Sequence, residues 1–371
     1  MLHPTLLLSA VLCVLAVTAA PPPKLNPHVL GGTDAKIGDV PMFAALYRTE
    51  YGTLSCGGSI LSKNIILTAA HCVVKPPSTR LAGPKQYVVR NPSELKYSVG
   101  NLQTNKPNLR TVTKIIVHDQ FNLTGELKND IALLQVEDVP LSDTIKTIKI
   151  YMGSLSEGDL LSAAGMGITD PKNDAPNTEL DIVTLPIESK ATCNAVVPDY
   201  QDSNGSQVCA GGVAGKDTCS GDSGGPLYKI FGKDHAQVGL TSFGGGPKED
   251  SPICGAAKGV GIYTHVASYI DWIATHSGIS ADILKYTPTK STGAMPSASS
   301  SVSATLASVP TPLPVPAKSV SASAPLSTLE QNPAAVNKAV PVAMTSTGAA
   351  PAAAGTSGSA ALSALQGLTV V

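Results

Sequence analysis

Hydrophobic residues between positions 29 and about 266 fall in short runs, continuous or alternating with polar residues, separated by Gly, Pro, Asn and Asp. Such runs bounded by turn-forming residues are typical of β-strands, and many in succession favour a barrel or a sandwich. The sequence therefore predicts an all-β domain whose strands include residues 59–70, 111–117, 131–136, 160–164 and 237–242.

A helical pattern appears only at residues 266–275. There Val266, Tyr269, Ile270 and Ile273 recur at i, i+3, i+4 and i+7, the spacing of one helix face. The segment also holds Trp272, the one tryptophan of the chain. We expect this helix to end the folded part.

The sequence changes character from about residue 280, where Ser, Thr, Ala and Pro dominate and no aromatic residue or cysteine follows Tyr286. Such a segment buries too little apolar area to offset its chain entropy, which predicts a disordered tail over residues 280–371. Its Ser, Thr and Pro content is also typical of an O-glycosylated stalk. The mildly apolar residues 360–371 permit a lipid-anchor signal, although the run is short and interrupted.

The N-terminal residues 5–20 form an apolar run that is short for a membrane span and ends in small residues. The pattern predicts a signal peptide at residues 1–20, with a membrane anchor as the alternative, and a short leader at residues 21–28. Removing Cys13 with the signal leaves six of seven cysteines, which suits a secreted, extracellular protein. Asn122 and Asn204 begin glycosylation motifs.

Composition narrows the classes of function. Without signal and tail, roughly 250 residues remain, enough for one large domain. The 371-residue chain has a formal net charge of −1, which gives no electrostatic reason to expect nucleic acid as a partner. No Cys/His spacing indicates zinc, so we expect no metal and no cofactor. No oligomerisation element stands out, and we expect a monomer.

A candidate nucleophile, Ser223, lies in the sequence Cys-Ser-Gly-Asp-Ser-Gly-Gly-Pro at residues 219–226. A serine hydroxyl attacks only when a base takes its proton and nearby donors hold the developing oxyanion. Glycines on both sides allow a tight turn whose amides face an oxyanion, although such patterns are also common in loops. The adjacent Asp222 needs a buried partner.

Two further motifs supply a candidate base and a candidate orienting carboxylate. His71 follows an apolar run in Leu-Thr-Ala-Ala-His-Cys, and Asp130 precedes one in Asn-Asp-Ile-Ala-Leu-Leu. Histidine is a suitable general base near neutral pH. Either residue alone would more often be structural. The three together in the order His, Asp, Ser favour nucleophilic catalysis.

In the order and local sequence of these motifs, the chain resembles the chymotrypsin–trypsin family of serine proteases from residue 29 to about residue 278. The resemblance implies an all-β fold of two six-stranded antiparallel β-barrels with a C-terminal α-helix, and a protease domain at residues 29–279. It also implies that Ser223 attacks the scissile carbonyl, that His71 is its base and that Asp130 orients His71. The backbone N–H groups of Gly221 and Ser223 would form the oxyanion hole.

The same resemblance implies the disulfides and the substrate pocket. The disulfides would join Cys56 to Cys72, Cys193 to Cys209, and Cys219 to Cys254. Asp217 matches the pocket-floor aspartate that receives Arg or Lys. The positions that match the rest of the substrate site are Ser242, which supports the triad aspartate, Phe243 in place of the usual tryptophan, the pocket-wall glycines Gly244 and Gly261, and Leu127 at the next subsite.

Activation departs from the family pattern. The resemblance implies a zymogen in which the new N-terminus, Val29, pairs with Asp222 after the leader is cut off. The residue before Val29 is His28, not Arg or Lys, so the protein should depend on a separate activating protease.

The calcium ligands of trypsin are not evident around residues 100–102, and residues 245–253 form a longer loop than in pancreatic trypsin.

The leading prediction is a secreted endopeptidase acting on proteins or peptides with Arg or Lys before the cleaved bond. The alternative is a non-catalytic homologue that serves as a secreted binding or inhibitor protein, and the unusual activation site is what favours it. A third interpretation makes the tail a surface anchor.

Overall fold

The computed structural model describes residues 29–76, 87–105, 107–123, 127–170, 173–246, 254–287 and 369–370. The predicted signal peptide, the leader, part of the loop at 245–253 and most of the predicted tail lie outside the described residues. In the described residues no helix has the length and hydrophobicity that a membrane span requires.

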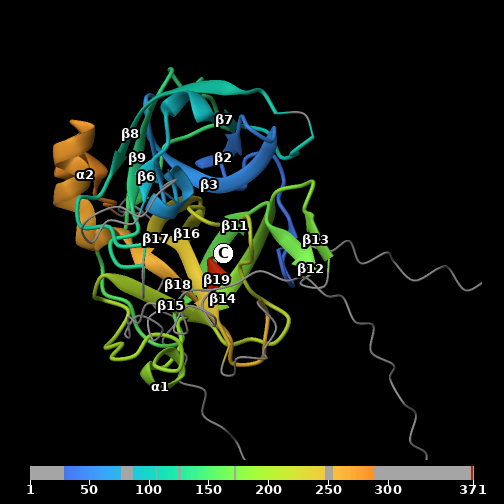
Figure 1. Cartoon of the computed structure of the whole chain (residues 1–371). Coiled ribbons are helices and arrows are strands. Elements are labelled where there is room, and N and C mark those ends of the chain that lie inside the picture. The colour runs from blue at the N-terminus through green and yellow to red at the C-terminus, as the bar shows by residue number, and fades with distance from the viewer. Residues whose placement is uncertain are drawn as a thin grey trace, which may run out of the picture. The chain divides into compact units, whose positions relative to one another are not determined.

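The first half of the chain forms a closed six-stranded barrel in the order β2-β3-β4-β9-β8-β7 (Figure 1). Its strands are β2 (Phe43–Arg48), β3 (Thr53–Ser62), β4 (Ile65–Thr68), β7 (Leu95–Val99), β8 (Arg110–Val117) and β9 (Ala132–Val136). The predicted strand at residues 59–70 is a hairpin instead. Exposed Lys63 and Asn64 turn the chain between β3 and β4, because apolar runs on both sides of them are buried.

The second half forms a sheet with the path β14-β11-β16-β17-β18-β15. A bridge between Ile187, just after β14, and Ala210 of β15 joins the two ends of this path, and Glu188 N–H donates to Cys209 O at 3.1 Å. The six-stranded path therefore closes on itself, and the predicted two-barrel architecture is confirmed. Its strands are β11 (Leu160–Gly165), β14 (Asp181–Pro186), β15 (Gln207–Gly211), β16 (Pro226–Phe231), β17 (Asp234–Gly245) and β18 (Val260–His265).

Three short strands extend the second barrel. β1 (Thr33–Asp34) pairs with β14, while β10 (Lys149–Ile150) and β19 (Thr369–Val370) pair with β17. The remaining short elements are β5 (Val74–Lys75) paired with β6 (Val88–Val89), β12 (Ile168–Asp170) paired with β13 (Asn173–Pro176), the 3₁₀ turns η1 (Ala70–Val73) and η2 (Pro92–Glu94), and the one-turn helix α1 (Lys190–Cys193).

The predicted C-terminal helix is present as the 3₁₀ turn η3 (Val266–Tyr269) followed by α2 (Ile270–Ser277), which lies beside β8 and β9 in Figure 1. It ends at Gly278, whose φ of 73° is the left-handed conformation that glycine adopts without strain. The folded part continues past the predicted boundary at residue 279. Helix α3 (Ala281–Leu284) buries Leu284, and Tyr286 N–H donates to Ile150 O at 2.8 Å.

The two barrels meet at a seam that holds the candidate nucleophile. Gly57 N–H of β3 donates to Ser223 O at 2.7 Å, and the Gln237 amide of β17 donates to Ser59 Oγ at 2.9 Å. A Cβ on Gly57 would lie 2.8 Å from Gly225 Cα, so only glycine permits this close approach of the two backbones. The seam thus places residues from both barrels around Ser223.

Candidate active site

The three predicted catalytic residues lie in one continuous row. The His71 Nε2 atom is 2.7 Å from Ser223 Oγ, and His71 Nδ1 is 2.7 Å from Asp130 Oδ2. The His71 side chain is 7 % exposed and that of Asp130 is fully buried. This geometry lets the imidazole take the serine proton on one side while the carboxylate holds it on the other.

Asp130 is fixed by several donors besides the imidazole. His71 N–H donates to Asp130 Oδ1 at 2.9 Å, and Ser242 Oγ donates to Asp130 Oδ2 at 2.5 Å. The Thr264 hydroxyl donates to the Asp130 backbone carbonyl at 2.8 Å. Ser242 therefore lies where the sequence predicted a supporting serine, and Thr264 is a further contact that no motif indicated. The bonds from His71 and Ser242 hold the carboxylate in a fixed orientation, and the bond from Thr264 holds its backbone.

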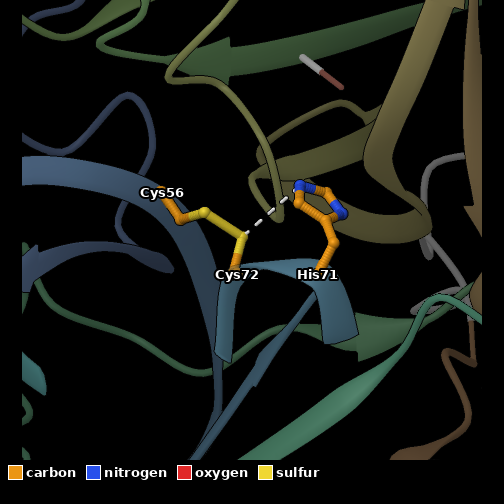
Figure 2. Close-up of side chains that lie close together, drawn as sticks. All are labelled: Cys56, His71 and Cys72. Carbon is orange, nitrogen blue, oxygen red and sulfur yellow. Dashed lines mark hydrogen bonds between the residues drawn. A yellow bond between two sulfur atoms is a disulfide. The ribbon is translucent and has the colours of Figure 1, made fainter. Parts of the chain in front are cut away.

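His71 projects from η1, the 3₁₀ turn that follows β4. Figure 2 shows the Cys56–Cys72 disulfide beside the imidazole, with Cys72 Sγ 3.8 Å from His71 Nε2. The potential ligand atoms of these three residues lie within 4.8 Å of one another, a spacing that would suit a metal ion. Metals bind cysteine as thiolate, and both sulfurs are already in the disulfide. The cluster therefore serves to anchor the turn.

The loop before β16 needs glycine on both sides of Ser223. Gly221 has φ 102° and Gly224 has φ 72°, in the region that residues with a Cβ rarely adopt. A Cβ on Gly221 would lie 2.9 Å from Gly167 Cα, and one on Gly224 would lie 2.2 Å from Thr68 Oγ1. This tight turn is what the flanking glycines of the motif predicted.

Asp217 is buried, with 5 % of its surface exposed. Gly255 N–H donates to its Oδ2 at 3.0 Å, while Oδ1 is buried and has no hydrogen-bond partner. Burial raises the pKa of Asp217 to about 7, although bonds from the Gly255 and Thr218 backbones oppose the shift. A buried carboxyl with one unsatisfied oxygen is a strong acceptor for an incoming cation.

The residues predicted to line the substrate pocket fall on neighbouring strands. Gly244 of β17 pairs directly with Gly261 of β18. Phe243 is 1 % exposed and packs in the same hydrophobic cluster as Leu127, so its ring is part of the core. β19 pairs with this stretch, with Val370 opposite Phe243 and Thr369 opposite Gly244.

Val29 is fully buried, and its N–H donates to Asp181 Oδ2 at 2.5 Å. Asp222, the partner predicted for Val29 after cleavage, accepts in this uncut chain from Gly167 N–H at 2.7 Å and from Cys219 N–H at 2.8 Å. Burial, together with smaller contributions from the charges of Asp181 and Asp217, raises the pKa of Asp222 to about 7 against the opposing effect of the two backbone hydrogen bonds. Sequence reasoning missed Asp181, which follows no motif and opens an ordinary apolar strand.

All three predicted disulfides are present, joining Cys56 to Cys72, Cys193 to Cys209, and Cys219 to Cys254.

Both predicted glycosylation sites are exposed. Asn204 holds the Leu155 backbone by accepting from its N–H at 2.8 Å and donating to its carbonyl at 2.9 Å. Glycosylation at Asn122 and Asn204 stays a prediction.

A buried aspartate, an imidazole and a serine in line at the seam of two six-stranded barrels define the class of serine proteases. Residues 29–273 match the Trypsin family, and the chain belongs to that family.

Several curated proteins are similar to the chain. It is 34 % identical over 264 residues to the CLIP domain-containing serine protease B4 of Anopheles gambiae, covering 67 % of this chain and 70 % of that protein. It is 34 % identical over 290 residues to Trypsin Tyr p 3.0101 of Tyrophagus putrescentiae, covering 74 % and 92 %. It is 31 % identical over 259 residues to Phenoloxidase-activating factor 3 of Holotrichia diomphalia, covering 66 % and 71 %.

Proposed function

We propose that this protein is a secreted endopeptidase that hydrolyses peptide bonds after Arg or Lys. The observation that carries the proposal is the row Ser223–His71–Asp130, with both side-chain contacts at 2.7 Å, together with the buried carboxyl of Asp217. The row supports acyl transfer through serine, and Asp217 supports selection of a cationic side chain.

In the proposed reaction Ser223 Oγ attacks the scissile carbonyl carbon while its proton passes to His71 Nε2. The backbone N–H groups of Gly221 and Ser223 stabilise the oxyanion that forms. The imidazolium, held by Asp130, then gives its proton to the leaving amine, and an acyl-enzyme remains. Water hydrolyses this ester with His71 again as the base, which restores Ser223.

The proposed polypeptide contact is the edge of β17 beside Ser242. β19 pairs there in antiparallel fashion at Phe243 and Gly244, so this edge can accept an added strand. Adding a strand to a sheet edge is a common way to bind an extended peptide. A substrate chain lying here would bring the residue before its scissile bond towards Gly244, Gly261 and Asp217.

The direct test is hydrolysis of short chromogenic peptides ending in Arg, Lys, Phe or Ala, with the full chain cut so that Val29 is its N-terminus. Cleavage restricted to Arg and Lys supports the proposal. Cleavage of Phe or Ala instead overturns the assignment of Asp217 alone. If folded protein cleaves nothing and does not react with a fluorophosphonate, which labels activated serines, the non-catalytic binding protein becomes the better explanation.

Secretion and dependence on a separate activating protease are parts of the same proposal. They are supported by the apolar N-terminal run, by three disulfides and by His28 before Val29. Relatives are named Phenoloxidase-activating enzyme, from Bombyx mori, and Proclotting enzyme, from Tachypleus tridentatus. These names favour a protein substrate over a small peptide.

Binding of benzamidine, a small amidinium cation, is expected to weaken below about pH 7. The pKa of Asp217 is raised to about 7, so the carboxyl is neutral at lower pH, and a cation must displace its proton. The apparent Kd should rise about tenfold for each pH unit below 7. Titrations of the fluorescent analogue p-aminobenzamidine at pH 5 to 8 measure this.

The control is a His71→Ala variant, which lacks the imidazole of the catalytic row. If Asp217 is responsible, that variant keeps the full pH dependence. An affinity that stays constant between pH 5 and pH 8 would contradict this assignment.

Ending the chain at Thr287 is expected to lower KM about threefold for peptides that extend several residues before the scissile bond. β19 occupies the β17 edge that such peptides need, and a tethered strand competes at a high effective concentration. A substrate with a single amino acid before the bond should show no change. A full-length Val370→Pro variant, which blocks strand pairing, should match the shortened chain, and an unchanged KM in both would rule out this competition.

A further inference from the structure

The segment that begins at Val29 is tied to the second barrel along its whole length. β1 pairs with β14 so that Thr33 lies opposite Ile182 and Asp34 lies opposite Asp181. Asp217 N–H donates to Leu30 O at 3.1 Å. Gly31 has φ 70°, and a Cβ there would lie 2.2 Å from Gly215 O, so the chain passes without room for a side chain.

The Val29 side chain packs among buried residues of the second barrel, including Leu161, Val183 and Tyr263. Its backbone nitrogen is therefore held in the interior, where its hydrogen bond to Asp181 Oδ2 is also buried. Asp181 is 0 % exposed. The Asn177 side-chain amide donates to the same carboxylate oxygen. Val29 and Asn177 thus converge on one side of a buried carboxylate.

A second carboxylate lies close to the first. Asp181 of β14 pairs with Gly165 of β11, and a Cβ on Gly165 would lie 1.9 Å from Asp222 Oδ1. One glycine thus separates the two aspartates, and each charge acts on the other, because Asp181 contributes to the raised pKa of Asp222. Two buried carboxylates on either side of one glycine repel each other unless a cation lies between them.

We propose that Asp181 is a second receptor for the new N-terminus, so that the Val29 α-ammonium, once the His28–Val29 bond is cut, is shared between Asp181 and Asp222. The inference rests on the proposed activation by cleavage. Val29 offers one N–H donor in the uncut chain, and this donor is already placed on Asp181. Hydrolysis turns it into an ammonium with three donors and a positive charge. One donor keeps the bond to Asp181, and the others are free to reach Asp222.

Asp181 is a positioning residue in this scheme. The Leu30 carbonyl, one residue from the ammonium, accepts from the backbone of Asp217. Leu30 also contacts Gly255, since a Cβ on that glycine would lie 1.8 Å from Leu30 Cδ2, and Gly255 donates to the Asp217 carboxylate. Holding the ammonium in place therefore holds the floor of the substrate pocket.

The test follows the protonation of the amine. An α-amino group has an ordinary pKa of about 7.7–8.0, and an adjacent carboxylate raises it by about one unit or more. The stabilisation is complete below the ordinary pKa and is lost as pH rises through the raised one. The charged groups near the amine are Asp181 of β14, Asp222 and Asp217 of the loop before β16, Asp34 of β1, and Lys216, which packs on Gly31.

The experiment measures the melting temperature of full-length Ser223→Ala protein at pH 7 to 11, both uncut and cut before Val29. The serine change prevents self-digestion, so the result does not depend on catalysis. The difference in melting temperature between cut and uncut protein should disappear as the pH rises, and the pH at which half of it is lost is the midpoint. Asp181→Asn should lower that midpoint by about one pH unit, a tenfold weaker hold on the proton. Asp34→Asn, on the neighbouring strand and exposed, should leave it unchanged.

A role confined to accepting the backbone N–H would affect cut and uncut protein equally and would not move the midpoint. An Asp181→Asn midpoint equal to that of the parent, or an equal shift in Asp34→Asn, overturns the proposal. If Asp181→Asn does not fold in the cut form, the more conservative Asp181→Glu is measured and must restore the parent's midpoint to within a few tenths of a unit. If cut protein that retains Ser223 hydrolyses no peptide, that result would contradict the proposed function and not the role of Asp181.

Discussion

Ser223→Ala, made in protein whose N-terminus is Val29, is expected to lower kcat for an Arg peptide about a million-fold. Removing the nucleophile of a serine protease leaves only binding and oxyanion stabilisation, and losses of this size follow. Here the Ser223 hydroxyl is 2.7 Å from His71 Nε2, within hydrogen-bond distance of the base. Single-turnover hydrolysis of a chromogenic Arg peptide measures the effect.

The Ser223→Ala protein should remain folded and should still bind p-aminobenzamidine, because Asp217 and the pocket walls are unchanged. This binding is the control that separates lost chemistry from lost structure. Activity within a hundredfold of the parent, in a preparation free of other proteases, would contradict the assignment of Ser223.

Asp217→Asn is expected to lower kcat/KM for Arg peptides about ten-thousand-fold. Sites built around a buried polar group discriminate by factors of 10⁴–10⁵, since the wrong partner leaves that group unpaired. The amide is nearly the same size as the carboxyl but carries no charge, so a guanidinium would enter a buried site without a counter-ion. Asp217 Oδ1, buried and without a partner, is the atom that this cation would satisfy.

Steady-state kinetics on Arg, Lys and Phe peptides test this expectation, with Asp143→Asn on the exposed surface as the matched control. The Phe peptide should be cleaved equally well by parent and variant, because its ring does not use the charge. Retention of Arg cleavage by Asp217→Asn would move the specificity determinant elsewhere in the pocket.

Motifs located the candidate site because its chemistry depends on close contacts that few sequences satisfy. The glycines beside Ser223 adopt backbone angles and make close backbone contacts that exclude other residues, so the turn around Ser223 can be predicted from the local sequence. The same holds for the cysteine pairs and for the order of His71, Asp130 and Ser223. The alternating apolar runs predicted the strands, but closure of the second barrel depends on the pairing of Ile187 and Glu188 with β15, which has no sequence pattern.

Residues whose role depends on tertiary packing could not be found in this way. Asp181 opens a strand of alternating burial, and only the pairing of β14 with β1 and β11 brings it to Val29 and Asp222. The burial of Phe243 likewise comes from tertiary packing, since its ring belongs to the hydrophobic cluster that also holds Leu127. Leu284 lies in a stretch whose composition resembles the tail, and its burial comes from the packing of α3 against α2 and β10.

The seam between the barrels has a consequence for how the protein opens. His71 and Asp130 belong to the first barrel and Ser223 to the second, so a separation of the barrels by a fraction of a nanometre breaks the 2.7 Å contact before any strand is lost. Partial openings of this kind cost less free energy than global unfolding. The rate of turnover therefore reports whether the two barrels are in contact. As denaturant is added, activity should be lost at concentrations where the circular dichroism of the strands is still unchanged.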